Sequence, residues 1–451
     1  MLLRFTALLA CSLTFACGDD RAQAPDAPVT PDAPSIDAPP ALLTAAEETA
    51  SHTLSPLAAV PADLTNAFAN TAGAARLGQM LFFDKTYAGA LAVADDGTNG
   101  GLGTVGATGK VSCASCHAVG SGHLDDRRSK PNNVSLGTDF GTRNALGIVN
   151  SSYYRWTNWG GRFDSQWSLP LAVAENAKIM NSSRLAVAHM LYDKYRTEYD
   201  AVFPVALDAR LVDTTVFPAT GKPAAAGSPP SAFDNLVQAD KDIINRIFAN
   251  YGKAIAAYMR LVVSVDAPFD RFVAGDRTAI SPSAVRGFKL FVSKNCISCH
   301  KGPNFADDEF HALGVLQTGP RVPSADLARY TDVVGLLASA FNTNGVYSDN
   351  TQTGKLAGLV QDTAQKGLFR TKSLRNVAES GPFMHSGQLA TLADVIDFYN
   401  RGGDAAATDT VKDAKMIALG LTPQDKLDLV AFLETLSGRS PAVSVLVDTS
   451  K

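Results

Sequence analysis

Few cysteines occur in this 451-residue sequence, and none is left over for a disulfide framework. Two of the six, Cys11 and Cys17, lie near the start, and the other four form two Cys-x-x-Cys-His units. Basic runs are also missing: the formal net charge is -4 and no Lys/Arg stripe is present, so nucleic acid is not an expected partner. No segment alternates apolar and polar residues for long, so a large β-sheet is not expected.

The early part of the sequence also lacks an apolar run long enough to span a bilayer. The run from Phe5 to Ala16 is too short for that but fits the central part of a secretory signal, so residues 1–16 are predicted to be a signal peptide. A small residue followed by Cys17 resembles a lipoprotein cleavage site and predicts lipidation there. Simple cleavage and release is the alternative, and Cys11 fits the consensus locally but leaves a very short apolar run. We expect a periplasmic protein, or one otherwise outside the cytoplasmic membrane, which contacts a membrane only through this lipid.

The remaining sequence divides by composition. Residues 17–45 repeat a Pro-Asp-Ala-Pro theme and are predicted to form an extended tether. Beyond them, a composition with 46% hydrophobic and 19% charged residues overall is typical of a globular protein. We predict an N-terminal domain over residues 46–265, a C-terminal domain over 266–440 with its boundary near Asp266-Ala-Pro268, and a tail over 441–451.

The two Cys-x-x-Cys-His units, Cys113–His117 and Cys296–His300, have the spacing of the haem c attachment motif. Two thiols at this spacing bond the vinyl groups of one haem, and the adjacent imidazole then faces the iron. A zinc knuckle would need four ligands close together, and a thioredoxin-like redox pair would not need a histidine in the same place twice. The sequence therefore predicts two covalently bound haem c groups, held by Cys113, Cys116, Cys296 and Cys299, with His117 and His300 as iron ligands.

Each unit follows a similar lead-in. Gly78 precedes Leu81-Phe82, and Gly287 precedes Leu290-Phe291 with the same helical spacing, which indicates an internal duplication of a cytochrome c unit. In the first copy a glycine-rich stretch at about residues 88–109 separates lead-in and motif and is predicted to be a surface loop.

Apolar periodicity indicates that most of the chain is helical. Residues 241–263 have apolar side chains at three- and four-residue intervals, which predicts a helix with one buried face. Thr422-Pro423 predicts the start of another helix, with Thr422 as its N-cap and Gly438 as its stop signal. The expected fold class is mainly α, with two cytochrome c-like helical domains that each enclose one covalent haem c.

Several further segments stand in order around the two units and lead to a known family. They are Arg76–Asp84, Thr142-Arg143-Asn144 with Val149-Asn150, Trp159-Gly-Gly-Arg162-Phe-Asp-Ser165, Phe369–Asn376, Gly381-Pro-Phe-Met-His385-Ser-Gly387, Ala390-Thr-Leu392 and Phe398-Tyr-Asn-Arg-Gly-Gly403. In this order they resemble the bacterial di-haem cytochrome c peroxidase and MauG family over about residues 76–438. In that family the N-terminal haem has an open or displaceable distal side where peroxide reacts, and the six-coordinate C-terminal haem passes electrons.

The resemblance implies roles for several residues. Trp159 stands where a tryptophan couples the two haems, and a core aromatic anchor is the alternative interpretation. The sixth ligand of the C-terminal haem falls fourteen residues after His385, at Tyr399, as in the MauG type. Met384 is the alternative ligand, and Tyr399 could also be an ordinary half-buried helix residue. The resemblance further implies a calcium ion between the domains, near Asn144, Ser380 and Pro382.

The match fails where the family keeps its distal acid. The glutamate and glutamine expected twenty and ten residues after Trp159 are replaced by Ile179 and Leu169, and the loop that holds a displaceable histidine reads Ser135-Leu-Gly-Thr138. Cleavage of peroxide requires a positioned acid/base. Glu175, one helical turn before Ile179, is the candidate replacement. His123 and His189 are further candidates to approach a haem, or ordinary structural residues.

These observations predict an exported di-haem c oxidoreductase with Trp159 and Glu175 as catalytic residues. It would reduce hydrogen peroxide with electrons from a small redox protein, such as a cytochrome c or cupredoxin, or oxidise a protein substrate. Two alternatives are an electron-transfer protein without peroxidase activity and an oxygenase-type haem enzyme whose apolar pocket binds another small ligand.

Overall fold

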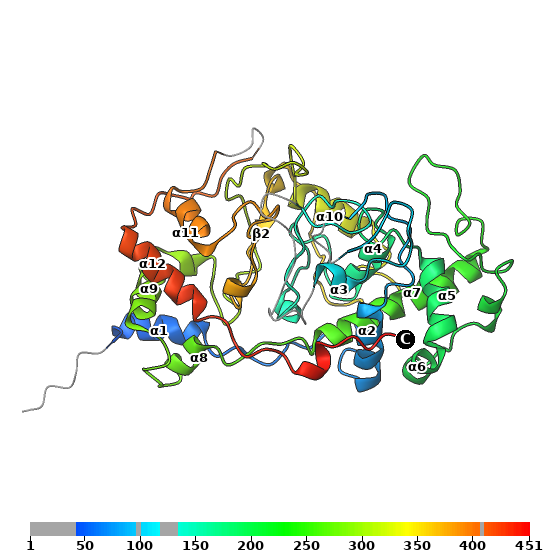
Figure 1. Ribbon diagram of the computed structural model, residues 1–451, viewed down its shortest axis with the longest axis horizontal. Coiled ribbons are helices and arrows are strands. Elements are labelled where there is room, and N and C mark those ends of the chain that lie inside the picture. Colours follow the sequence, from blue (N-terminus) through cyan, green and yellow to red (C-terminus); the bar gives the residue numbers. More distant parts are fainter. Residues whose placement is uncertain (1–41, 96–100, 118–133, 406–409) are drawn as a thin grey trace, which may run out of the picture. The chain divides into compact units, whose positions relative to one another are not determined.

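Helices make up nearly all the regular structure of this computed structural model, which describes residues 42–95, 101–117, 134–405 and 410–451 (Figure 1). In these ranges the strands are limited to β1 (Phe310–His311) and β2 (Phe369–Arg370), which pair antiparallel with Phe310 opposite Arg370. The predicted mainly α fold class is therefore confirmed. The predicted signal peptide, Cys17, nearly all of the tether and His123 lie outside the described residues.

The helices fall into two groups along the chain. The first group comprises α1 (Ala45–Leu54), α2 (Ala72–Phe83), α3 (Cys113–Cys116), α4 (Ser168–Glu175), α5 (Arg184–Lys194), α6 (Arg196–Val202) and α7 (Gln238–Met259). The second comprises α8 (Pro268–Val273), α9 (Pro282–Ser293), α10 (Arg329–Ala338), α11 (Leu392–Asn400) and α12 (Pro423–Glu434). Short 3-10 turns and long irregular segments connect them.

Two pairs of crossing helices correspond to each other, α2 with α7 and α9 with α12 (Figure 1). At each crossing the lead-in glycine lies against the backbone of the partner helix. A Cβ on Gly78 would lie 1.9 Å from the carbonyl oxygen of Ala254, and a Cβ on Gly287 would lie 1.9 Å from that of Asp428. Only glycine fits at such a distance. The repeated Gly-x-x-Leu-Phe lead-in therefore gives both Cys-x-x-Cys-His units the same close helix packing.

Three local predictions have different outcomes. The helix predicted over 241–263 is α7, which begins at Gln238 and ends at Met259. Thr422 caps α12 as predicted, because its hydroxyl accepts from the Asp425 N–H while the Asp425 carboxylate accepts from the Thr422 N–H. Gly438 is not the stop signal, since α12 ends at Glu434; a Cβ on Gly438 would lie 2.6 Å from the Val265 carbonyl, so close chain packing explains this glycine.

The stretch over residues 88–109 is an irregular loop with exposed glycines, as predicted, but two of its leucines attach it to the protein interior. In its described parts Leu91 and Leu102 are buried and belong to the core of the first helix group. Glycine content gives a loop its conformational freedom, but these two leucines bury apolar surface and attach the loop to the core.

The two largest hydrophobic cores each lie mainly in one half of the chain, and each end of the described chain contributes to the core of the opposite half. The first core surrounds α2, α5 and α7, and the second surrounds α8, α9 and α12. Leu43 and Leu54, at either end of α1, belong to the second core, whereas Val445 near the C-terminus belongs to the first. The Gln79 side-chain amide donates to the carbonyls of Ser444 and Val447, which holds the C-terminal segment on α2.

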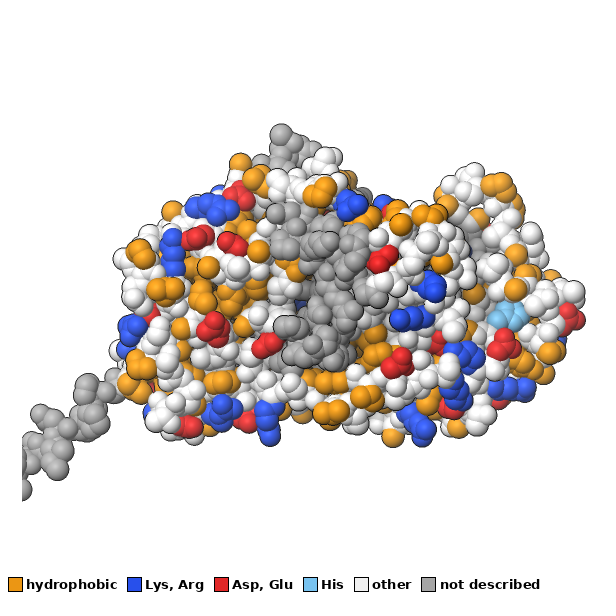
Figure 2. Space-filling view, in the orientation of Figure 1, with side chains coloured by type: hydrophobic (Ala, Val, Ile, Leu, Met, Phe, Trp, Pro, Cys, Tyr) orange, Lys and Arg blue, Asp and Glu red, His pale blue; other side chains and the backbone are white. Residues whose placement is uncertain are grey.

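The surface has no simple electrostatic signature on the side shown in Figure 2, where described Lys and Arg side chains are interspersed with Asp and Glu. Within the described ranges, none of the helices combines the length and the apolar character needed to cross a membrane.

Candidate active site

The C-terminal Cys-x-x-Cys-His unit lies just beyond α9, where the chain turns through a 3-10 helix (Cys296–Ser298). Nδ1 of His300 lies 3.0 Å from the carbonyl oxygen of Phe305. Burial lowers the pKa of this imidazole, so the neutral ring donates its Nδ1 proton to that carbonyl. The hydrogen bond to Phe305 orients the ring so that Nε2 is the nitrogen that would bind a metal, and the imidazole also contacts the backbone of Lys372.

Cys296, Cys299 and His300 line a cavity of about 600 Å³. Its volume falls within the roughly 300–1,000 Å³ of small-molecule and cofactor sites. Tyr399, from α11, and Met384 line the same cavity. The structure thus brings together both thiols, the predicted proximal histidine and both candidates for the sixth ligand. The residues present fit a haem bound at this unit.

Tyr399 and Met384 differ in what they require to bind iron. Burial, reinforced by the nearby thiols Cys296 and Cys299, raises the pKa of the Tyr399 hydroxyl above its usual range. Its phenol is therefore neutral unless a cation displaces the proton. Met384 needs no deprotonation, and its backbone has a φ of 68°, which is unusual for a residue other than glycine.

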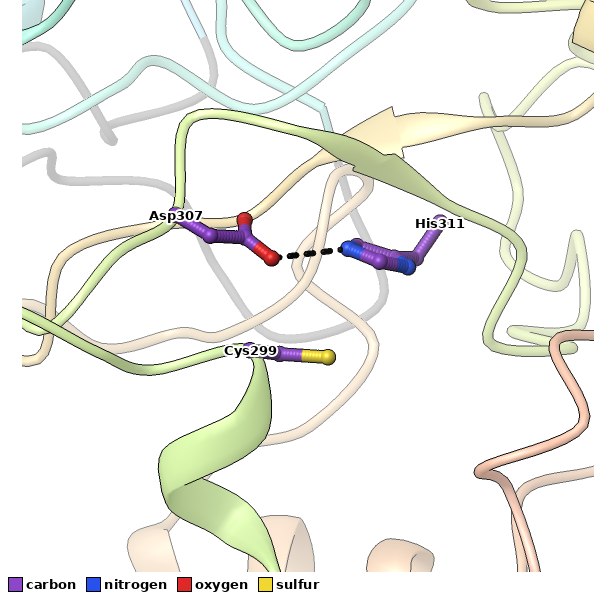
Figure 3. Close-up of side chains that lie close together, drawn as sticks. All are labelled: Cys299, Asp307 and His311. Atoms are coloured by element: carbon purple, nitrogen blue, oxygen red, sulfur yellow. Dashed lines mark hydrogen bonds and ion pairs between the residues drawn. The ribbon is translucent and has the colours of Figure 1, made fainter.

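A polar cluster lies against the second cysteine of this unit. Figure 3 shows Cys299 beside Asp307 and His311, whose ligand atoms all lie within 4.8 Å of one another. Nε2 of His311 lies 3.1 Å from Asp307, and Nδ1 lies 2.6 Å from the carboxylate of Asp413. Contacts with Cys299, Asp413 and Asp307 raise the pKa of His311 to about 9. Sulfur, imidazole and carboxylate could hold a transition metal, but the same sulfur is needed for a thioether bond to haem.

The N-terminal unit has different surroundings. Cys113 and Cys116 form α3, and burial raises the pKa of the Cys113 thiol to about 12. Cys113 packs against the first core, in which the hydroxyls of Tyr87 and Tyr251 lie 2.7 Å apart. The sulfur of Cys116 lies 3.6 Å from the carbonyl oxygen of Leu136. This unit therefore sits between the α2–α7 crossing and the segment that begins at residue 134.

Trp159 is buried and connects the two regions. Its indole Nε1–H donates to the carbonyl of Asn144 at 2.8 Å, and the Asn144 N–H donates to the carbonyl of His385 at 2.7 Å. The imidazole of His385 meets the indole edge-on with ring centroids 6.3 Å apart, and stacks on Phe369 at 3.8 Å. Trp159, Phe369 and His385 also line the cavity of the C-terminal unit. Trp159 therefore contacts both this cavity and the backbone at Asn144.

The predicted calcium ligands lie close together but are already hydrogen-bonded. The Asn144 side-chain amide donates to the carbonyl of Pro382 at 3.1 Å, while its oxygen accepts from Ser135 at 3.2 Å. The hydroxyl of Ser380 donates to the Val377 carbonyl. Calcium here would require the Asn144 amide to turn so that its oxygen, a suitable ligand for a hard cation, faced Pro382.

Comparison with known proteins establishes the family. A family model described as di-haem cytochrome c peroxidase matches residues 72–278. Cytochrome-c peroxidase IdrP1 of Denitromonas iodatirespirans is 33% identical over 396 residues, which cover 86% of this chain and 88% of that protein. The chain belongs to the di-haem cytochrome c peroxidase family.

Other relatives in this family include MauG proteins. Methylamine utilization protein MauG of Methylorubrum extorquens is 30% identical over 342 residues, which cover 75% of this chain and 76% of MauG. The solved structure of the diheme peroxidase BthA from Burkholderia thailandensis has a TM-score of 0.57 at 20% identity, over 85% of this chain and 91% of BthA. The resemblance to the di-haem peroxidase and MauG family is thus confirmed, and BthA supports the fold.

Ile179, one of the two positions where an apolar residue replaces the polar group expected from the family, lies in a closely packed seam. The Thr138 N–H donates to the carbonyl of Ile179 at 2.9 Å, and a Cβ on Gly137 would lie 2.4 Å from the same oxygen. Leu169 lies in α4, in the segment that leads to Ile179. The loop without a distal histidine and the segment without the distal glutamate therefore pack directly on each other.

Glu175 and His189 have partners that suggest structural roles. The Glu175 carboxylate accepts from Nε and Nη2 of Arg184 at 2.8 and 2.9 Å, and the Arg184 guanidinium packs over the ring of Phe248. Nε2 of His189 lies 2.9 Å from the carbonyl of Phe217. Both side chains are therefore engaged within the first core.

Sequence reasoning missed Gln317, His311 and the stacking of Phe369 on His385. The Gln317 side-chain amide lies 2.5 Å from Nε2 of His385, and burial lowers the pKa of His385 to about 4. Gln317 lies in an irregular segment, where no periodic pattern could identify it. The family motifs did include His385 and Phe369, but not the contact between them.

Proposed function

We propose that this chain is an exported di-haem c oxidoreductase that reduces hydrogen peroxide, or oxidises a partner, through two haems coupled by Trp159. The observation that carries the proposal is the position of Trp159. It lines the cavity of the His300 unit and bonds to Asn144, in the segment that follows the His117 unit. Membership of the di-haem peroxidase family supports the peroxidase part of the proposal.

Four cysteines and two histidines would hold the haems. Cys113 and Cys116 would form thioether bonds to one haem and Cys296 and Cys299 to the other, with His117 and His300 as proximal ligands. Bound haem supplies an iron that takes up oxidising equivalents from peroxide and exchanges single electrons. The residue His300 contributes a fixed neutral imidazole through its bond to Phe305.

Tyr399 is the proposed sixth ligand of the C-terminal haem, with Met384 as the alternative. Both residues line the cavity. A phenolate is an anionic oxygen donor and favours ferric iron, whereas a thioether favours the reduced state. Tyr399 ligation therefore implies a lower reduction potential than Met384 ligation, which makes this haem a stronger electron donor to the peroxide-reactive side.

A second candidate function, electron transfer without peroxidase activity, is favoured by the distal positions. Ile179 and Leu169 cannot move a proton between the peroxide oxygens, and Glu175 is paired with Arg184. If Glu175 acts as the acid, it must first leave this ion pair. The replacement of both polar groups by Ile179 and Leu169 therefore argues for slow peroxide cleavage.

Turnover by the fully haem-loaded protein separates the two candidates. Reduced cytochrome c or a reduced dye is mixed with the protein and hydrogen peroxide, and its oxidation is followed by stopped-flow absorbance. We expect peroxide-dependent oxidation that is slowed in Trp159→Phe. Loaded protein that accepts electrons from the donor but shows no peroxide dependence would overturn the peroxidase proposal in favour of electron transfer.

Location and redox partner follow from the predicted export signal and from the proposed activity. We propose a periplasmic location, with a lipid at Cys17 as the membrane contact and a small redox protein, either a cytochrome c or a cupredoxin, as the electron donor. A protein substrate in place of peroxide is the MauG-like alternative. Mass spectrometry of the mature N-terminus would test the lipid, and calcium titration of the haem-loaded protein would test whether Asn144 rotates to bind the ion.

A further inference from the structure

Several buried charged side chains lie beside residues 158–161, the loop that contains Trp159 (the Trp159 loop). The proposed function does not use them. Arg143 donates to both carboxylate oxygens of Asp326, at 2.6 and 2.7 Å, and to Oδ2 of Asp332 at 2.8 Å. The side chains are 15%, 8% and 8% exposed. Burial opposes the charge of Arg143, but its bonds to the two carboxylates raise its pKa above the usual range. Arg329, which is also buried and interacts with Asp332, adds a second guanidinium, so two carboxylates are packed among two guanidiniums here.

Asp332 reaches the Trp159 loop at Gly160. A Cβ on Gly160 would lie 2.2 Å from Oδ2 of Asp332, so this carboxylate fills the space that a side chain at position 160 would need. Arg329, in the first turn of the same helix α10, donates to the carbonyls of Gly160 and Gly161 at 3.3 and 2.8 Å. Helix α10 thus fixes the residues directly after Trp159 and holds a carboxylate against them.

A cation lies near the indole itself. Nζ of Lys372 is 6.0 Å from the ring centroid of Trp159 and 4.7 Å from that of Tyr154. The Nε1–H of Trp159 donates to the carbonyl of Asn144, which is too weak a base to accept the proton. An indole that loses an electron here keeps its proton and carries a full positive charge. Nearby charges then stabilise or destabilise that state, more strongly in a buried site than in water.

We propose that Asp332 and Lys372 bias the Trp159 relay in opposite directions: Asp332 stabilises positive charge on the indole, and Lys372 opposes it. This inference rests on the proposed relay function of Trp159. The step removes one electron from the Trp159 indole, and its oxidant would be the haem that Cys113 and Cys116 would hold, after that haem has reacted with hydrogen peroxide. The Nε1–H bond stays intact and no covalent bond forms or breaks; the electron that restores the indole would come from the haem that His300 would bind. Asp332 is in this sense a positioning residue.

Two charge-removing variants test the proposal. Asp332→Asn keeps the shape and a hydrogen bond to Arg143, and Lys372→Met removes the ammonium. Electron transfer between the haems is followed optically in a single turnover, after protein with a reduced C-terminal haem is mixed with hydrogen peroxide. We expect Asp332→Asn to slow this step about tenfold and Lys372→Met to speed it about threefold. The yield of indole radical by EPR, with no donor present, should fall in the first variant and rise in the second.

Stability and potential measurements exclude a merely structural effect. Asp428→Asn is the matched control, because it neutralises another buried carboxylate bonded to an arginine, Arg286, in the second core. It should lower the denaturation midpoint without changing the electron-transfer rate. The potential of the C-terminal haem is measured in each variant, since Lys372 lines that cavity.

The same two charge variants made in protein that also carries Trp159→Phe show whether their effects act through the indole. With the indole absent, Asp332→Asn and Lys372→Met should have no further effect on the rate, because the group on which they act is gone. Equal effects with and without Trp159, or slowing by both variants, would overturn the proposal. If Trp159→Phe alone leaves the rate unchanged, the proposed relay function fails first. If it slows the step while Asp332→Asn does not, only the present inference fails.

Discussion

The two Cys-x-x-Cys-His units follow the same helical frame but have different chemical surroundings. Gly78 and Gly287 each bring a lead-in helix to the same distance from a partner backbone. Beyond that frame, Cys113 packs among buried aromatics with its thiol pKa raised to about 12, whereas contact with His311 lowers the pKa of Cys299. The frame therefore fixes where a haem is held, and the irregular segments around it determine its reactivity.

The largest loss of stability is expected at the two helix crossings, which are alike in the two halves of the chain. Gly78→Ala and Gly287→Ala would each place a Cβ 1.9 Å from a carbonyl oxygen, so the helices must separate and the free energy of unfolding should fall by about 3 kcal/mol or more. Gly335→Ala in α10 is the matched control, because its nearest neighbour would lie 3.5 Å away. That variant should gain about 0.5–1 kcal/mol. Urea denaturation of all three would reveal a failure of the close-packing account if the crossing variants lost no more stability than the control.

An intermediate loss of stability is expected at Glu175 in the N-terminal half, because its carboxylate pairs with Arg184. Glu175→Gln should lower the free energy of unfolding by about 1–3 kcal/mol, since it leaves a largely buried guanidinium without its anion. The rate of reaction with peroxide should stay unchanged. Thermal denaturation and stopped-flow absorbance measure the two effects, with Arg184→Met as the companion variant. Loss of peroxide reaction at unchanged stability would instead make Glu175 the catalytic acid.

A smaller effect is expected for the pH dependence of stability, through His311 beside the C-terminal unit. With Cys299 as a free thiol the pKa of His311 is raised to about 9, and contacts with Asp413 and Asp307 keep it raised when that sulfur bonds haem, whereas an unfolded histidine titrates at about 6.5. Between these values the folded state binds more protons than the unfolded state, so stability is fully present below about pH 6.5 and falls as pH rises toward 9. We expect a loss of about 1–2 kcal/mol. His311→Asn should flatten the dependence in chemical denaturation; a dependence of equal size in that variant would exclude His311 as its source.

The features that could be predicted from the sequence are those that depend on short spacings between residues. The two units, their lead-ins and the Thr422 cap each span a few residues, and the structure shows the expected local arrangement for both lead-ins and for the cap. Family motifs also predicted that Tyr399 and His300 would lie in the same region. These features are encoded locally or by an ordered set of motifs.

The sequence could not predict contacts between distant segments. Arg143 and Asp332 are 189 residues apart and lie in no common pattern. The spacing of Glu175 from Ile179 suggested a shared helix face, but the nearby guanidinium of Arg184 determines what that carboxylate binds. Likewise, α1 precedes the first unit in sequence yet packs in the second core, because burial of Leu43 and Leu54 decides its place.

The two haems should differ in coordination, and EPR of the resting, fully loaded ferric protein tests this difference most directly. We predict one high-spin signal from the N-terminal haem and one low-spin signal from the C-terminal haem. Tyr399→Phe should abolish the low-spin signal, whereas the matched variant Met384→Leu should leave it intact. Two equivalent low-spin signals in the wild type, or a low-spin signal unchanged in Tyr399→Phe, would contradict this assignment.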